Sequence, residues 1–139
     1  MRESKYSVPF RKSQRFHICE APFHREAANM RHCVDFAVSE GTPVVAARDG
    51  VVVERESRYA RAYGNKRYAN RTNYVVLRHA DGEETLYVHL RRHSVRVRVG
   101  QLVRRGQIIA LSGQTGYATY PHLHFGAYDR RGRNIPINF

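Results

Sequence analysis

Residues 73–90, NYVVLRHADGEETLYVHL, decide the fold class of this chain. They hold two runs rich in β-branched and aromatic side chains, 73–79 and 84–90, on either side of Asp81-Gly82. Two such runs joined by a short turn that contains glycine predict an antiparallel β-hairpin. The hairpin is the starting point around which further strands are expected to pair.

Short apolar runs continue on both sides of this hairpin, separated by glycine turns. Strands of this length and spacing predict an all-β fold, a small antiparallel sandwich or barrel-like single domain. Residues 55–72, polar and rich in tyrosine, predict a long surface loop. The other predicted strands are at 94–99, 107–112, 122–128 and 42–53, the last as two strands around the hairpin dipeptide Asp49-Gly50.

The chain length of 139 residues predicts one domain with a single core. Residues 1–30 hold two prolines and no clear period, so we expect a segment that wraps the sheet formed by 31–139. No window approaches 18 apolar residues, which predicts no membrane span. The N-terminal stretch shows no apolar core of a secretory signal, so the sequence leaves the compartment open.

The chain is strongly basic, with 24 Lys and Arg against 12 Asp and Glu and a formal net charge of +12. Such a charge attracts polyanions, including an anionic cell-wall polymer or nucleic acid. Nucleic acid is the weaker expectation because the arginine-rich stretch 91–105 contains no aromatic side chain on which bases could stack. Cys19 and Cys33 lack the CxxC spacing of a redox pair, and spacing alone leaves their pairing open.

Two of the eight histidines are separated by one residue, in PHLHF at 121–125. In a strand, His122 and His124 project to one face, whereas Leu123 and Phe125 project to the other. Two imidazoles on one face predict a platform for metal binding or acid–base chemistry. The alternative is a pair of surface histidines on a solvated face.

His89 and Asp35 extend this candidate site. Alternation with Thr85 and Tyr87 places His89 on the polar face of its predicted strand. Asp35 is the single acid in the apolar run HCVDFAV, and a buried carboxylate costs several kcal/mol unless it is paired or binds a metal. A paired structural carboxylate is the alternative. The nearby GQTG, 113–116, lacks the GK[ST] context of a phosphate-binding loop.

Three blocks together resemble the lysostaphin/LytM-type zinc metallopeptidases: residues 34–52, 73–90 and 97–125. The motifs that carry the resemblance are VDFAVSEGTPVVAARDGVV, LYVHL and PHLHF, in the order and with the spacing of that family. The resemblance implies a small antiparallel β fold with a groove that holds one Zn²⁺ ion. It also implies hydrolysis of peptide bonds in peptidoglycan stem or cross-bridge peptides.

Position by position, the resemblance implies that Asp35 and His124 are metal ligands and that His89 and His122 are catalytic histidines. The first metal ligand of the family stands four residues before the aspartate, where this chain has Arg31. A guanidinium stays protonated and cannot bind zinc. Since catalytic zinc sites use three protein ligands, a third donor must come from elsewhere.

His24 is the third ligand that we favour, because members of the resembling subgroup tend to have a histidine about ten residues before VDFA. His32 needs a bulge to reach the face of Asp35, and the thiolate of Cys33 is a further source on that face. The predicted metal set is therefore His24, Asp35 and His124. The alternative function is a catalytically inactive member of the fold that binds a peptide or a protein, with the metal lost at Arg31.

Tyr120 is a second departure from the family, which usually has glycine just before PHLHF. A tyrosine there is predicted to narrow the substrate groove or to lend its phenol to the developing oxyanion. Packing of the ring on its loop neighbours is the alternative.

Overall fold

The computed structural model describes residues 4–19, 28–60, 62–63 and 70–139. Within these ranges the structure contains β-strands, one 3₁₀ turn, η1 (Ala28–Met30), and no α-helix. No helix in this part of the chain is long and apolar enough to cross a membrane. The strands are β1 (His17–Cys19), β2 (Val34–Ala37), β3 (Pro43–Val45), β4 (Gly50–Glu56), β5 (Ala62–Tyr63), β6 (Tyr74–Arg78), β7 (Glu84–Val88), β8 (Leu102–Val103), β9 (Ile108–Leu111), β10 (Gly116–Tyr117), β11 (His122–Tyr128) and β12 (Asn134–Ile135).

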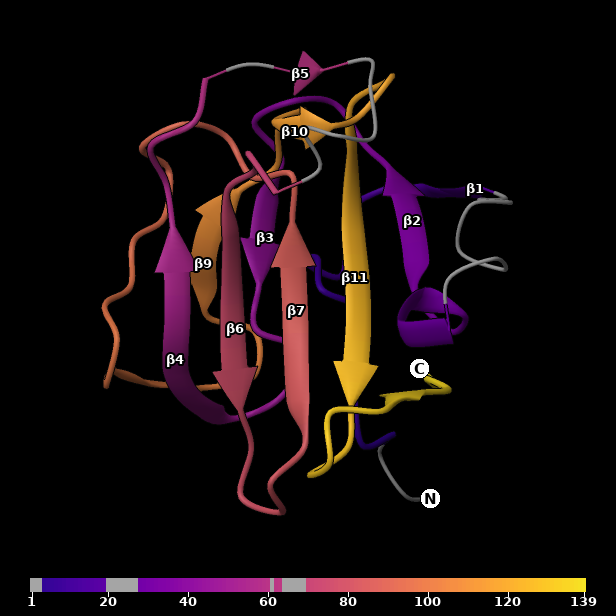
Figure 1. Ribbon diagram of the computed structural model, residues 1–139, viewed down its shortest axis with the longest axis vertical. Helices are drawn as coiled ribbons and strands as arrows, with labels where there is room; N and C mark the ends of the chain where they lie inside the picture. Colours follow the sequence, from indigo (N-terminus) through magenta and orange to yellow (C-terminus); the bar gives the residue numbers. More distant parts are fainter. Residues whose placement is uncertain (1–3, 20–27, 61, 64–69) are drawn as a thin grey trace.

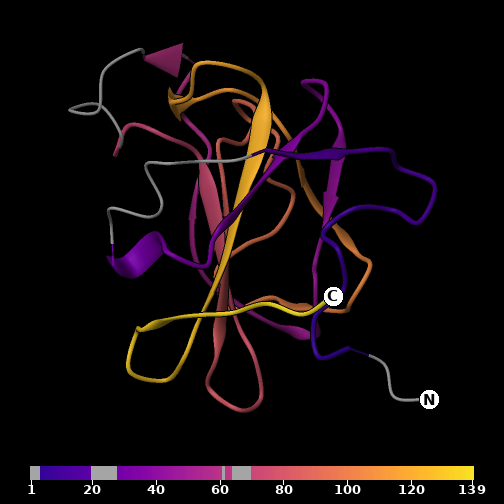
Figure 2. The same cartoon turned by 90° about the vertical axis from the view of Figure 1, so that its right-hand side faces the viewer.

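One large sheet dominates the molecule (Figure 1). Its strand order is β1-β2-β11-β7-β6-β4-β8, with β12 also paired to β11, and these pairs are antiparallel. Two smaller pairs complete the fold: antiparallel β3–β9, which lies beside the large sheet (Figure 2), and parallel β5–β10. The predicted all-β antiparallel fold is confirmed.

The predicted hairpin of residues 73–90 is present as β6 and β7, in register from Tyr74 opposite Val88 to Arg78 opposite Glu84. Its turn closes with a 2.8 Å hydrogen bond from the His79 amide to the carbonyl of Glu83. The hairpin lies in the middle of the large sheet, next to β11, the strand that carries the two paired histidines.

Residues 42–53 contain the two predicted strands, β3 and β4, but these do not pair as a hairpin, because β3 pairs with β9 while β4 pairs with β6 and β8. Asp49 instead lies in the connection from β3, in the two-stranded β3–β9 sheet, to β4, which begins at Gly50 in the large sheet. Residues 94–99 form no strand despite their alternation; within them the amide of Arg96 donates one hydrogen bond to the carbonyl of Ile109.

The core lies between the large sheet and the β3–β9 pair, and it includes side chains of the N-terminal segment. Phe36, Phe125 and Tyr87 are fully buried on the inner face of the large sheet. Phe10 packs edge-on against Phe36 at 5.3 Å between ring centroids, and Tyr6 is also buried. The described residues 4–19 therefore contribute side chains to the core of the β domain, while the division at residue 30 remains a prediction.

Phe36→Ala is expected to destabilise the protein by about 3–5 kcal/mol, because it removes a fully buried ring and leaves a cavity among Phe10, Phe125 and Phe139. Urea unfolding followed by circular dichroism measures this loss. Ile18→Ala is the control: that side chain is 57% exposed, and we expect a change within about 0.5 kcal/mol. Equal effects of the two substitutions would contradict the assigned core.

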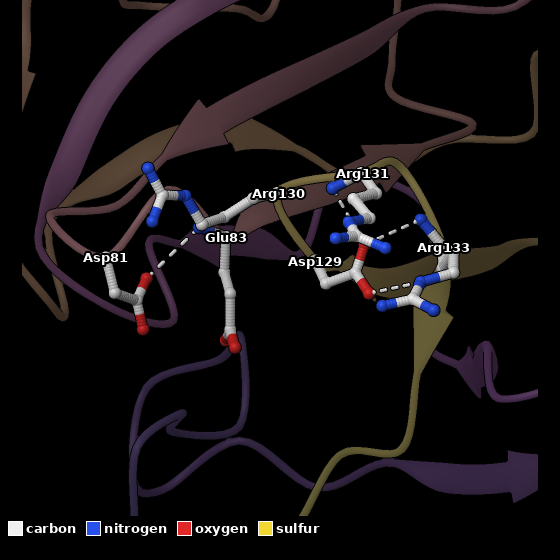
Figure 3. A pocket seen from close by; sticks show the side chains of 6 residues that line it. All are labelled: Asp81, Glu83, Asp129, Arg130, Arg131 and Arg133. Atoms are coloured by element: carbon white, nitrogen blue, oxygen red, sulfur yellow. Dashed lines mark hydrogen bonds and ion pairs between the residues drawn. The ribbon is translucent and has the colours of Figure 1, made fainter.

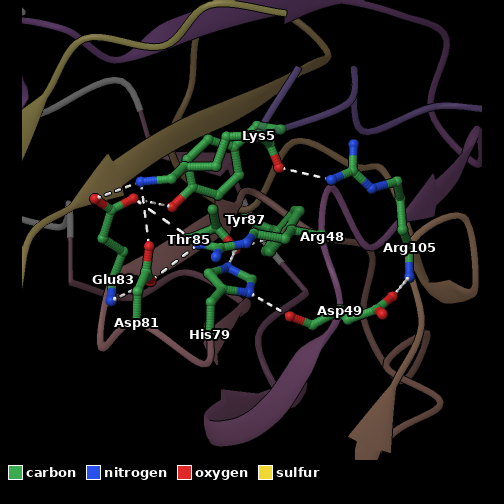
Figure 4. A network of polar contacts seen from close by, with 10 residues as sticks. Lys5, Arg48, Asp49, His79, Asp81, Glu83, Thr85, Tyr87 and Arg105 are labelled. Carbon is green, nitrogen blue, oxygen red and sulfur yellow. Dashed lines mark hydrogen bonds and ion pairs between the residues drawn. The ribbon is translucent and has the colours of Figure 1, made fainter. Parts of the chain in front are cut away.

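A network of hydrogen bonds and ion pairs connects the N-terminal segment to the turn between β6 and β7 (Figure 4). The hydroxyl of Tyr6 donates a 2.6 Å hydrogen bond to the carboxylate of Glu83. The ring of His79 is buried beneath it, with Nδ1 2.7 Å from the carbonyl oxygen of Asp49 and Nε2 2.9 Å from Oγ1 of Thr85. His79 is therefore a structural histidine.

Acid is expected to weaken the fold through His79, since burial lowers its pKa below the ordinary 6.5. The unfolded chain takes up this proton near pH 6.5, whereas the folded chain takes it up only at lower pH. The contribution to stability is complete above pH 6.5 and is lost as pH falls towards the folded-state pKa. Unfolding free energies of the wild type and His79→Gln at about pH 7.5 and about pH 5 test this. The variant should lose less stability on acidification; an equal loss in both proteins would refute the assignment.

Candidate metal and acid–base site

Asp35 and His124 lie directly opposite each other on the adjacent strands β2 and β11. Their side chains meet on the outer face of the sheet, with 3.0 Å between Oδ1 of Asp35 and Nδ1 of His124. Both side chains are buried. The register continues on either side of the pair, with Cys19 of β1 opposite Asp35 and Val88 of β7 opposite His124.

His122 projects to the same face, since it precedes His124 by two residues in β11. Leu123 and Phe125 are fully buried in the core on the opposite face, which confirms the predicted alternation. Nδ1 of His122 lies 2.8 Å from the carbonyl oxygen of Tyr120. Because a carbonyl oxygen only accepts, Nδ1 carries the hydrogen and the neutral ring has its lone pair at Nε2, 3.7 Å from Oδ2 of Asp35.

His89 reaches the site by a route that strand alternation did not predict. Thr85 and Tyr87, expected to share a polar face with it, are fully buried, and Tyr87 packs against Phe125 in the core. Had β7 continued, His89 would also point into the core. The strand instead ends at Val88, and His89 has a left-handed backbone with φ +69°. The prediction that it shares the face of Thr85 and Tyr87 is wrong.

The turn at the end of β7 brings the third imidazole to the other two. The ring centroid of His89 lies 4.6 Å from that of His122 and 6.0 Å from that of His124. Its Nδ1 lies 2.6 Å from the carbonyl oxygen of Thr115, so this nitrogen also carries the hydrogen. One carboxylate and three imidazoles therefore gather from β2, the end of β7 and β11.

The three imidazoles differ in their affinity for protons. Burial, together with the neighbouring His122 and His124, lowers the pKa of His89 to about 3. Burial also lowers the pKa of His122, although the carboxylate of Asp35 opposes this shift. His124 is deeply buried too, but its hydrogen bond with Asp35 raises its pKa to about 9. At neutral pH, His89 and His122 are neutral and His124 forms an ion pair with Asp35.

Cys33 lies on the face of Asp35, as alternation along β2 predicts. A Cβ atom added at Gly126 would be 2.5 Å from its sulfur, so the thiol occupies space that only glycine leaves open. The sulfur is 3.6 Å from the hydroxyl of Tyr128 and accepts a 3.6 Å hydrogen bond from Nδ2 of Asn134. Cys33 and Cys19 are not joined by a disulfide.

Tyr120 stacks on the ring of His122, with 4.5 Å between centroids and 30° between planes. Burial and a hydrogen bond with Cys19 raise the pKa of its phenol, which keeps the hydroxyl protonated. Tyr120 thus packs on the ring of His122, while its part in a substrate groove or at the oxyanion stays a prediction.

The described residues supply part of a zinc site. Asp35 and His124 offer a carboxylate oxygen and an imidazole nitrogen, which are donors that zinc prefers. In the described ranges, no three His, Cys, Asp or Glu side chains are arranged to hold a metal ion. Arg31 is exposed, and the amide of His32 is tied to Oδ1 of Asn134 at 2.6 Å. The favoured third ligand, His24, lies outside the described residues.

Sequence reasoning missed the polar residues that surround His89. Thr72, Asn73 and Thr115 are buried and hydrogen-bonded around the end of β7. A polar Thr-Asn pair next to the apolar run of β6 was the available signal, since buried polar groups need specific partners. The GQTG stretch supplies Thr115 to this cluster.

A separate pocket of about 400 Å³ lies at the other end of the hairpin (Figure 3). Acidic and basic side chains balance each other there, as in the 2.8 Å ion pair between Asp129 and Arg133. The pocket contains none of the predicted site residues. Its lining residues are Asp81, Glu83, Asp129, Arg130, Arg131 and Arg133.

Known proteins resemble the chain in both sequence and structure. It is 39% identical over 126 residues to a protein of Haemophilus influenzae named as an uncharacterized metalloprotease, covering 89% of this chain and 22% of that protein. It is 44% identical over 104 residues to the peptidoglycan DD-endopeptidase ShyA of Vibrio cholerae, covering 75% and 21%. The chain thus spans about a fifth of the length of these curated relatives.

Among solved structures, the catalytic domain of lysostaphin from Staphylococcus simulans matches with a TM-score of 0.61 and 35% identity, over 77% of this chain and 75% of that one. The family profile described as Peptidase family M23 matches residues 29–137, which include β2 to β12 and all the described site residues. The resemblance to lysostaphin/LytM-type peptidases is therefore confirmed, and the chain belongs to peptidase family M23.

Proposed function

We propose that this chain is a zinc-dependent metalloendopeptidase that hydrolyses peptide bonds in the stem or cross-bridge peptides of peptidoglycan. The observation that carries the proposal is the Asp35–His124 pair, flanked on one face by the two neutral imidazoles of His89 and His122. Membership of the family and relatives named as peptidoglycan endopeptidases support it.

Asp35, His124 and His24 are the proposed metal ligands. Oδ1 of Asp35 and Nδ1 of His124 come from directly paired residues of adjacent strands, which fixes their separation with little freedom. They fit two of the three protein positions of a catalytic zinc site. When bound there, zinc would polarise the scissile carbonyl group and make the attacking water more acidic.

His122 is the proposed general base. Its Nδ1 donates to the Tyr120 carbonyl, so its Nε2 holds the lone pair that can accept a proton from the attacking water. The carboxylate of Asp35, 3.7 Å away, stabilises the imidazolium ion that results. The same nitrogen can then return the proton to the leaving amine.

His89 is proposed to orient the attacking water. Its lowered pKa keeps it neutral, and its hydrogen on Nδ1 is engaged by the Thr115 carbonyl. Nε2 can therefore accept a hydrogen bond from the second hydrogen of the water. Two acceptors, His89 and His122, then align the oxygen lone pair of the water with the carbonyl carbon, which lowers the entropic part of the barrier.

One observation favours the second candidate, a catalytically inactive binding protein: Arg31 occupies the position of the usual first ligand and is exposed. Mass spectrometry of metal content on protein purified without chelators decides between the two. Near-stoichiometric zinc and cleavage of purified peptidoglycan, followed by chromatography of the released fragments, would support the peptidase. Absence of bound zinc even after zinc is supplied would support the binding protein.

We further propose that the basic surface binds the anionic polymers of a cell wall. The net charge of +12 supports this, and such binding should weaken steeply with salt. Binding to DNA with equal affinity and no sequence preference would place nucleic acid among the partners instead.

A further inference from the structure

We infer that Thr72 is a positioning residue that holds His89 in the orientation and tautomer in which its Nε2 faces the reaction. The inference rests on the proposed function for its catalytic consequence, whereas the effect on the His89 ring is independent of it. Thr72 is buried, only 7% exposed, and lies just before β6, next to the end of β7.

The hydroxyl of Thr72 joins the two parts of the chain that fix His89. It donates a 3.0 Å hydrogen bond to the carbonyl oxygen of Thr115, the same oxygen that receives the Nδ1 hydrogen of His89 at 2.6 Å. It also accepts a 3.3 Å hydrogen bond from the backbone amide of His89. One hydroxyl therefore contacts both the backbone of His89 and the acceptor of its ring.

Neighbouring groups hold the Thr72 hydroxyl in place. A Cβ atom added at Gly116 would lie 2.5 Å from Cβ of Thr72, so the loop backbone packs directly on this side chain. The amide of Asn73 donates to Oγ1 of Thr115 at 3.1 Å, and that hydroxyl donates to the carbonyl of Leu90 at 2.8 Å. The acceptor for the His89 ring is thus part of a closed, buried network.

His89 needs this support because its backbone is left-handed, which a residue with a Cβ atom adopts at a cost. The hydrogen bond to its amide favours that conformation, and the Thr115 carbonyl fixes the ring hydrogen on Nδ1. Among the described residues, the hydrogen bonds of the His89 ring are made by Nδ1, and Nε2 makes none. With Nδ1 engaged by the Thr115 carbonyl, Nε2 is the ring nitrogen left for the proposed water.

The test compares Thr72→Val, which removes the hydroxyl at nearly constant volume, with Thr72→Ser, which keeps it. Thr42→Val is the matched control: Thr42 is also 7% exposed and its hydroxyl also donates to a backbone carbonyl, that of Ser39, away from His89. Long-range ¹H–¹⁵N spectra of the histidine rings report the tautomer, zinc analysis reports the metal, and steady-state kinetics on purified peptidoglycan fragments separate kcat from KM.

We expect the wild type, Thr72→Ser and Thr42→Val to show His89 with its hydrogen on Nδ1. Thr72→Val should show a mixture of the two tautomers, a kcat lower by about 10-fold or more, and unchanged KM and zinc content. If Thr72→Val does not fold, Thr72→Cys replaces it in the test, because a thiol is only a weak donor. It should give a smaller change in the His89 tautomer population and a smaller loss of kcat. A wild-type tautomer and kcat in a folded Thr72→Val or Thr72→Cys protein overturn the inference.

The spectra keep this inference separate from the proposed function. If the wild type cleaves no peptide but Thr72→Val still alters the His89 tautomer, the positioning role stands and the peptidase proposal fails. If the wild type is an active peptidase but the His89 tautomer does not change in Thr72→Val, the peptidase proposal stands and the positioning role of Thr72 fails.

Discussion

Asp35→Ala is expected to abolish both zinc binding and peptide cleavage. The substitution removes one of two proposed ligands that meet at 3.0 Å on the sheet face. Loss of an outer-shell partner typically lowers metal affinity or activity about 10–100-fold, so loss of a ligand should exceed that range. Metal analysis after dialysis and a peptidoglycan cleavage assay measure the two effects. Asp129→Asn changes a partly exposed carboxylate just after the far end of β11; it is the control and should retain both.

The same measurement identifies the third ligand. His24→Ala should lose zinc, whereas His32→Ala and Cys33→Ser should keep it. Loss of zinc in Cys33→Ser alone would assign the position to the thiol that lies over Gly126. Retention of zinc in all three variants, or in Asp35→Ala, would contradict the proposed ligand set.

His122→Ala is expected to retain zinc but to lower kcat by about 10²–10⁴-fold, the usual contribution of a general base. The substitution removes the Nε2 lone pair that lies next to Asp35 and is proposed to accept the proton. It leaves the proposed ligands Asp35 and His124 in place. His17→Ala is the control, because His17 is an exposed histidine of β1, two strands from β11. Steady-state kinetics and metal analysis of the same preparations give both quantities.

A His122→Ala protein that loses its zinc would move His122 into the ligand set. Unchanged kcat with full zinc occupancy would remove it from the mechanism and leave His89 as the remaining base.

The central part of the fold could be predicted because its signals are local. The hairpin of residues 73–90 contains its own turn, and β11 alternates between His122 and His124 on one face and Leu123 and Phe125 on the other. The two strands within residues 42–53 were predicted, but their pairing was not, because a hairpin and a connection between two sheets use the same turn residues. Pairing partners 50 or more residues away, in β8 and β9, decide between them.

The candidate site could also be predicted only in part. Asp35 and His124 follow from strand alternation together with the family resemblance, and the register of β2 with β11 makes them neighbours. The position of His89 could not be derived from periodicity, because alternation ends at Val88 and the left-handed backbone of the next residue reverses its side. That reversal depends on Thr72 and Thr115, which are distant in sequence.

The ring of His122 takes its orientation from a main-chain carbonyl, that of residue 120, and this has a consequence for engineering the chain. A carbonyl oxygen is present whatever side chain residue 120 carries. The protonation pattern of the proposed base is therefore insulated from substitutions at a position whose ring lies directly against it. Residue 120 is therefore a position at which the side chain can be varied while the carbonyl that orients the proposed base stays in place.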